Sequence, residues 1–202
     1  MRTTDFLKAC QLSGADFDKC FSRALQSLFE NWKEGAPGRT DIGPFDPFHI
    51  KRVKLSQTIE NVANIQAELA NINAHGFSKS KVVKSSYILT ATIRLRDVFW
   101  SNLKYFVAIK TQLKQIGNER FFSIISLSSD IKDIEGHHMQ LNNLFNGDPE
   151  LGEATNQIIN ENWRDFFQIM RPAITEAIDA IIFDRFKKIF NYLPARFFVS
   201  DL

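Results

Sequence analysis

The sequence predicts an α+β protein in which a long, bent C-terminal helix is wrapped by a strongly curved antiparallel sheet, with a short amphipathic helix at the N-terminus. Three observations predict this fold: a helical apolar stripe over residues 17–33, alternation of period two over about 49–141, and a longer helical stripe over about 149–192. A long apolar helix beside one sheet is best buried if the sheet curls around it. The length favours a single domain over residues 1–202.

The N-terminal helix is indicated by apolar residues spaced three and four apart. These residues are Phe17, Cys20, Phe21, Ala24, Leu25, Leu28, Phe29 and Trp32. Gly35 and Pro37 end the helix, because glycine favours the position after a helix and proline cannot continue one. The prolines and glycines of residues 35–47 then predict a rigid, extended connector.

The strands are predicted where apolar and polar residues alternate. The pattern is clearest from Tyr87 to Leu95 and weaker at 50–55, 65–73, 103–109 and 121–127. No clean helical stripe of ten or more residues interrupts this region. We therefore expect short connections and an antiparallel sheet.

The long C-terminal helix is expected to begin at Pro149, with Asp148 as its N-cap. Apolar residues keep helical spacing almost to Pro194, which gives about 40 residues and a length of roughly 60 Å. Pro172 lies inside this stripe and should bend the helix rather than end it, because the stripe stays in phase on both sides.

Composition and motifs argue against several classes of protein. The 25 Lys and Arg residues nearly balance the 23 Asp and Glu residues, which disfavours nucleic acid as a partner. No apolar run reaches about 18 residues, so stable membrane insertion is not expected. The sequence contains no nucleophile elbow, metalloprotease motif or phosphate loop, and His137 and His138 would point to opposite faces of a strand. We expect no enzyme activity, metal or cofactor, and an esterase is the least favoured function.

Two features leave alternatives open. The 19 phenylalanines either fill an ordinary core or line a tunnel for an apolar ligand, and composition does not decide between them. The only cysteines, Cys10 and Cys20, are either two buried thiols or a short disulfide.

Two blocks of the sequence resemble the insect haemolymph juvenile hormone binding and Takeout family. The first contains Cys10 to Cys20, the helix from Phe21 to Leu28, Gly35, and Ile42 to Pro47; the second contains Asn143 to Gly152, Asn160 to Trp163, and Pro172. The resemblance implies a tubular lipid-binding fold and a Cys10–Cys20 disulfide. It also implies a protein secreted into haemolymph or another extracellular fluid, which carries a juvenile hormone-like terpenoid or a fatty acid in an internal apolar tunnel. Two cysteines look more like the Takeout branch.

The same resemblance implies a ligand site between the N-terminal helix and the end of the long helix. The corresponding residues are Leu25, Leu28, Phe29, Trp32 and Phe45 on one side, and Phe186, Ile189, Phe190, Phe197 and Phe198 on the other.

The sequence departs from the family pattern in the middle. Only residues 96–102 separate Leu95 from Leu103, where the family usually carries a further hairpin, so about two strands are expected to be missing. A shortened sheet would leave an exposed apolar slot, suited to a protein partner or to self-association. The alternative function is therefore an extracellular interaction or signalling protein that binds no lipid and has a shortened or self-filled cavity.

Overall fold

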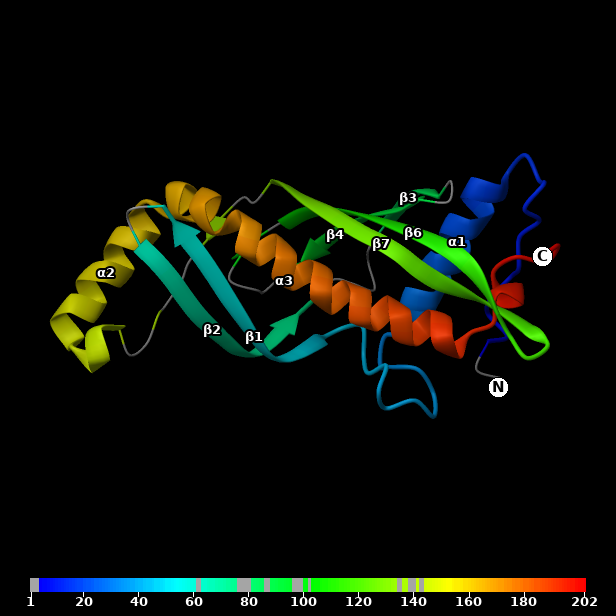
Figure 1. Ribbon diagram of the computed structural model, residues 1–202, viewed down its shortest axis with the longest axis horizontal. Helices are drawn as coiled ribbons and strands as arrows, with labels where there is room; N and C mark the ends of the chain where they lie inside the picture. Colours follow the sequence, from blue (N-terminus) through cyan, green and yellow to red (C-terminus); the bar gives the residue numbers. More distant parts are fainter. Residues whose placement is uncertain are drawn as a thin grey trace.

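The computed structural model describes residues 4–60, 63–75, 81–85, 88–95, 100–101, 103–133, 136–137, 141 and 144–202. In chain order its elements are α1 (Phe17–Asn31), β1 (Phe48–Ile59), β2 (Ala63–Ala74), β3 (Lys81–Ser85), β4 (Ile88–Leu95), β5 (Trp100–Ser101), β6 (Leu103–Ile116), β7 (Glu119–Asp133), β8 (Gly136–His137), the 3₁₀ turn η2 (Leu144–Gly147), α2 (Pro149–Glu161), α3 (Trp163–Tyr192) and the 3₁₀ turn η3 (Ala195–Phe197). Helix α3 runs along the long axis of the molecule, with α2 at one end and α1 and both termini at the other (Figure 1).

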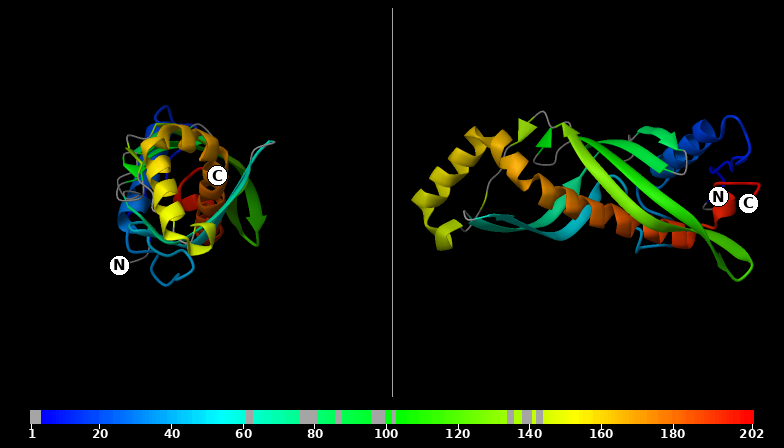
Figure 2. Two further views of the ribbon diagram at one scale, coloured as in Figure 1. Left: turned by 90° about the vertical axis from the view of Figure 1, so that its left-hand side faces the viewer. Right: turned by 45° about the horizontal axis from the view of Figure 1, so that its top comes forward.

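The predicted α+β class with a long C-terminal helix is confirmed, but the described strands do not form one sheet. They form a β1–β2 hairpin, a four-stranded sheet in the order β3-β4-β6-β7, and a short β5–β8 pair, all antiparallel. Helix α3 contacts both β1 and β7, so it lies between the two larger sheets (Figures 1 and 2). The wrap around the helix is therefore shared between two sheets. Tyr87 and His138, which the sequence assigned to strands, lie outside the described residues.

The β1–β2 hairpin changes its inward face halfway along. Toward one end Ile50 and Ile72 pair and are partly buried, whereas toward the other end Val53 and Leu69 do so. In β1 the inward-facing residues change from even to odd positions between Ile50 and Val53. Asn71 of β2 lies opposite this stretch, and its φ of 56° breaks the regular extended geometry. Each half of the hairpin thus turns an apolar face toward α3, although simple alternation fails across the whole strand.

The predicted single helix over about 149–192 is two helices that meet at Asn162. Asp148 caps α2 as expected, because its carboxylate accepts a hydrogen bond from the backbone N–H of Leu151 at 3.0 Å. At Asn162 the side-chain amide donates to the carbonyl of Ile158 at 2.9 Å while its own backbone is not helical. Pro172 lies inside α3 without ending it, as the sequence predicted.

Helix α1 matches its predicted range to within two residues at the C-terminal end. It ends at Asn31, and Trp32 is its C-cap, donating its backbone N–H to the carbonyl of Leu28. Helix α1 lies against β3 and meets α3 through Phe29, whose ring centre is 6.0 Å from that of Phe186. Val107 of β6 and Ile131 of β7 belong to the same core. Among the described helices, none is both long enough and apolar enough to cross a membrane.

Candidate functional site

An aromatic cluster occupies the end of the molecule where α1 meets the C-terminal end of α3. We define it by six rings in edge-to-face or tilted contact, with centroid separations of 5.4–6.2 Å. They are Phe29, Phe45, Phe122, Phe186, Phe190 and Phe198. The cluster therefore joins α1, the connector after it, β7, α3 and the C-terminal tail.

The connector places Phe45 by folding back on the end of α1. The backbone N–H groups of Phe45 and Asp46 both donate to the carbonyl of Lys33, at 2.9 and 3.0 Å. This return requires Gly35, whose φ is 111° and where an added Cβ would lie 3.1 Å from the backbone of Gly43. The turn brings the Phe45 ring to 5.4 Å from that of Phe29.

The structure brings the ten sequence-predicted ligand residues together at this end of the molecule. Nine are buried with at most 4% of their surface exposed: Leu25, Leu28, Phe29, Trp32, Phe45, Phe186, Ile189, Phe190 and Phe198. Phe197 is partly buried at the edge of the group. The sequence reasoning missed Phe122 of β7, although the alternation at 121–127 had already marked it as a strand residue. The rings pack against one another, and the entry of a ligand between them stays a prediction.

Trp32 is the polar exception in this apolar region. Its side chain is fully buried between the rings of Phe6 and Tyr192, at centroid distances of 6.5 and 6.1 Å. The indole Nε1–H donates to no acceptor within the described part of the chain. An unpaired buried donor costs about 1–3 kcal/mol. A ligand that placed an acceptor atom beside this N–H would remove that cost and would therefore bind more tightly.

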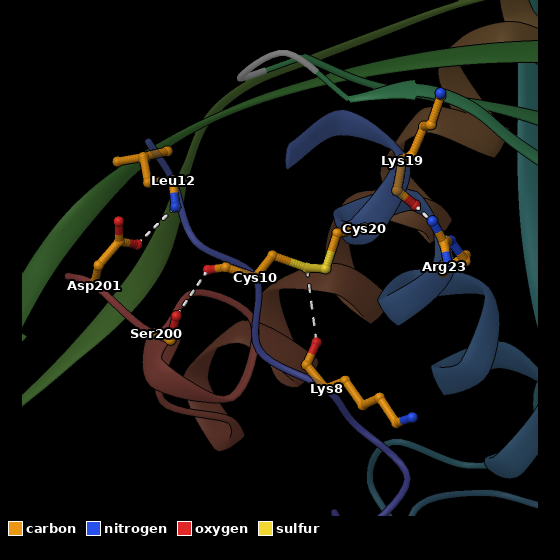
Figure 3. Close-up of a disulfide and its surroundings, with 8 residues drawn as sticks. All are labelled: Lys8, Cys10, Leu12, Lys19, Cys20, Arg23, Ser200 and Asp201. Carbon is orange, nitrogen blue, oxygen red and sulfur yellow. Dashed lines mark hydrogen bonds between the residues drawn. A yellow bond between two sulfur atoms is a disulfide. The ribbon is translucent and has the colours of Figure 1, made fainter. Parts of the chain in front are cut away.

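A disulfide fastens this end of the molecule. Cys10 and Cys20 are bonded, with Cα atoms 5.8 Å apart, which resolves the alternative that the sequence left open (Figure 3). Cys10 also pairs with the C-terminal tail: its N–H donates to the carbonyl of Phe198, and its carbonyl accepts from Ser200, both at 2.9 Å. The bridge therefore links α1, through Cys20, to the segment that carries Phe198.

A second feature, which the sequence did not predict, is an open cleft of about 1,010 Å³ between β1 and α3. None of the ten predicted residues lines it. Its lining residues are Thr40, Asp41, Gly43, Pro44, Phe48, His49, Ile50, Lys51, Arg52, Val53, Lys54, Ser56, Ala173, Glu176, Ala177, Ala180, Ile181, Asp184, Arg185 and Lys188. We call this the β1–α3 cleft.

Arg185 is the most enclosed charge of the β1–α3 cleft. Its guanidinium carbon lies 4.1 Å from the centre of the Phe48 ring, and its Nη1 lies 3.5 Å from the carbonyl oxygen of Pro44. Burial lowers the pKa of the Arg185 guanidinium, and the neighbouring Asp184 carboxylate partly opposes this shift. The group stays a cation, since the ordinary pKa of an arginine side chain lies far above neutral pH.

A long helix held between antiparallel sheets, with an aromatic interior at one end, defines an α+β protein of the tubular type. The family model of haemolymph juvenile hormone binding protein matches residues 2–96 and 88–200. The chain therefore belongs to the haemolymph juvenile hormone binding protein family, whose members bind small hydrophobic ligands.

One relative and one solved structure are also similar to this chain. The circadian clock-controlled protein daywake of Drosophila melanogaster is 23% identical over 212 residues, which covers 85% of this chain and 78% of that protein. The crystal structure of Takeout 1 from Epiphyas postvittana superposes with a TM-score of 0.66 at 16% identity, covering 96% of this chain and all of the other. At that identity the second likeness supports the fold alone.

Proposed function

We propose that the protein is a secreted carrier that buries a small, elongated hydrophobic ligand, a juvenile hormone-like terpenoid or a fatty acid, in its apolar interior. The observation that carries this proposal is the indole N–H of Trp32, which is buried and has no acceptor among the described residues. The matching ligand is mainly hydrocarbon and bears at least one oxygen acceptor, and both ligand classes meet this description.

Such binding needs no covalent chemistry. Each buried methylene group contributes about 0.8 kcal/mol, which is roughly a fourfold gain in affinity. The affinity for a homologous series should therefore rise with chain length until the available space is filled. Family membership supports the same role, since the family takes its name from a hormone carrier of haemolymph.

The Cys10–Cys20 bridge supports secretion. Disulfides persist in oxidising compartments and are rare where glutathione keeps thiols reduced. An extracellular fluid such as haemolymph is also the setting that the family name describes.

A second function, an extracellular interaction or signalling protein without a lipid ligand, is favoured by two observations. The six rings of the aromatic cluster contact one another directly, so the side chains themselves fill that space. Large apolar side chains are also exposed elsewhere, on the β6–β7 hairpin and on α2, where a partner or a second copy would find them. They are Leu113, Ile116, Ile125, Leu151 and Ile158.

A native mass spectrum of the purified protein before and after organic extraction separates the two functions. The carrier predicts a discrete adduct that extraction removes, or saturable uptake of an added fluorescent fatty acid. A clean apo mass together with refusal of both fatty acids and juvenile hormone would contradict the carrier and favour the interaction protein.

A further inference from the structure

The β1–α3 cleft owes its space to short side chains on one face of α3. Ala173, Ala177 and Ile181 follow one another at intervals of four residues, and Arg185 continues the same row. Two alanines in this row leave room between α3 and β1 that larger side chains would fill. The row therefore lines the bottom of the cleft with apolar side chains over about two turns of α3 and ends in a cation.

The guanidinium of Arg185 is fixed at the cationic end by its surroundings. Stacking on Phe48 and contact with the carbonyl of Pro44 hold it against the 43–44 backbone, where its Nη1 lies 3.1 Å from the position of an added Cβ on Gly43. The stacking orients the planar guanidinium group, but neither the ring nor the carbonyl group neutralises its positive charge. Among the described residues, no carboxylate lies within 4.0 Å of this guanidinium.

Two of the three carboxylates that line the cleft are engaged with other cations. Asp184 accepts from Lys188 at 2.6 Å, and Asp41 pairs with Arg39 at 2.7 Å. The third, Glu176, lies nine positions before Arg185 on α3, about 13 Å away along the helix axis. Lys51 and Lys54 of β1 are exposed along the opposite wall. The end of the cleft at Arg185 is thus suited to an anion.

We propose that the β1–α3 cleft is a second binding site, separate from the aromatic cluster, for a single-chain amphiphile with a carboxylate head. Arg185 binds the head, and the row of Ala177 and Ile181 with Phe48 contacts the hydrocarbon chain. A carboxylate is favoured because one guanidinium fork matches its two oxygens and balances its single charge. A volume of about 1,010 Å³ is ample for such a ligand.

The test compares a fluorescent long-chain acid, dansylamino-undecanoic acid, with its methyl ester, by titration into the whole protein. In the wild type the acid should bind more tightly than the ester, by roughly tenfold or more, as expected for a charge-assisted hydrogen bond at a half-buried site. Arg185→Gln keeps much of the side chain and removes the charge. It should bring the ratio of the two dissociation constants close to one by weakening acid binding alone.

Two further variants keep the interpretation clear. Arg164→Gln is the matched control. Like Arg185, Arg164 belongs to α3 and stacks on an aromatic ring, that of Trp163 at 4.4 Å, but it lies outside the cleft. Arg164→Gln should leave the ratio at the wild-type value. Ala177→Phe retains every charge and fills the bottom of the cleft, so it should weaken the acid if the chain lies there. This variant also tests the site if Arg185→Gln does not fold.

The outcomes separate this site from the carrier function. Equal binding of acid and ester by the wild type would overturn the cleft site and leave the carrier function standing, because the ester is a neutral hydrophobic ligand. An acid preference that survives both Arg185→Gln and Ala177→Phe would also overturn the cleft site. Binding of neither probe would overturn the cleft site alone, because a carrier of a juvenile hormone-like terpenoid need not bind either probe, and the extraction experiment would then decide the carrier function.

Discussion

The carboxylate of Asp201 accepts a hydrogen bond from the backbone N–H of Leu12 at 2.6 Å, across 189 positions of the chain (Figure 3). The backbone N–H and the hydroxyl of Ser13 bond the second oxygen at 3.4 and 3.2 Å. These contacts extend the pairing of Cys10 with the tail, so the two ends of the chain form one small polar unit beside the aromatic cluster. The Cys10–Cys20 bridge then joins this unit to α1.

This arrangement predicts that the junction of the two termini is acid-sensitive. The hydrogen bond from the Leu12 N–H, followed by those from Ser13, lowers the pKa of Asp201 below its ordinary value of 3.8. A lowered folded-state pKa stabilises the fold above the ordinary value, and that contribution is lost as the pH falls through the folded-state value. The amide proton shifts of Leu12 and Ser13, followed by NMR, should therefore titrate with a midpoint below 3.8.

Asp201→Asn provides the control for this titration. The amide retains one oxygen acceptor but carries no charge, so the shifts of Leu12 and Ser13 should no longer titrate in that range. Unchanged titration in the Asn variant would show that another carboxyl group is responsible.

The disulfide should contribute measurably to stability. In the chain-entropy model a bridge across a sequence separation of 10 stabilises the fold by about 2–3 kcal/mol. Replacement of both Cys10 and Cys20 by serine should lower the free energy of unfolding by that amount in a denaturant titration. Reduction of the wild type should have the same effect and should add nothing to the double variant. A double variant as stable as the oxidised wild type would contradict this role.

The main elements were predictable because they depend on local periodicity. The range of α1 was predicted to within two residues, and the N-cap at Asp148 was predicted correctly, since both depend on neighbouring residues. The break between α2 and α3 was not predicted, because the apolar stripe continues across Asn162 and one side-chain hydrogen bond ends the helix there. The division of the wrap between two sheets was also missed, since strand pairing is non-local.

The candidate site shows the same limit. Residues of α1 and α3 entered the predicted ligand set through the family resemblance, and the structure does gather them. Phe122 and the β1–α3 cleft were missed, because β7 and β1 reach α3 through tertiary packing that no local pattern encodes. The alanine row of α3 could have given a signal, as Ala173 and Ala177 lie one turn apart on a helix otherwise rich in large apolar residues.

The aromatic cluster should respond unequally to truncation at two nearby phenylalanines. Phe190 is 1% exposed and contacts the rings of Phe122 and Phe198, so Phe190→Ala should cost about 3–5 kcal/mol. Phe197 is only partly buried, and Phe197→Ala should cost clearly less. Denaturant titrations of the two variants check this order. Equal losses would show that the packing of Phe190 is not what stabilises this end.

Trp32→Phe tests the proposed role of the indole N–H. The change removes the buried donor and keeps an aromatic ring, so the ligand-free protein should lose little stability, because the unpaired group no longer imposes its cost. Binding of a ligand with an oxygen acceptor should weaken by up to roughly tenfold, the loss expected for one hydrogen bond. A hydrocarbon of the same length should bind the variant and the wild type alike. Trp163→Phe, at the far end of α3, is the matched control and should change neither affinity. Equal weakening of the oxygenated ligand and the hydrocarbon by Trp32→Phe would show that Trp32 acts by packing alone.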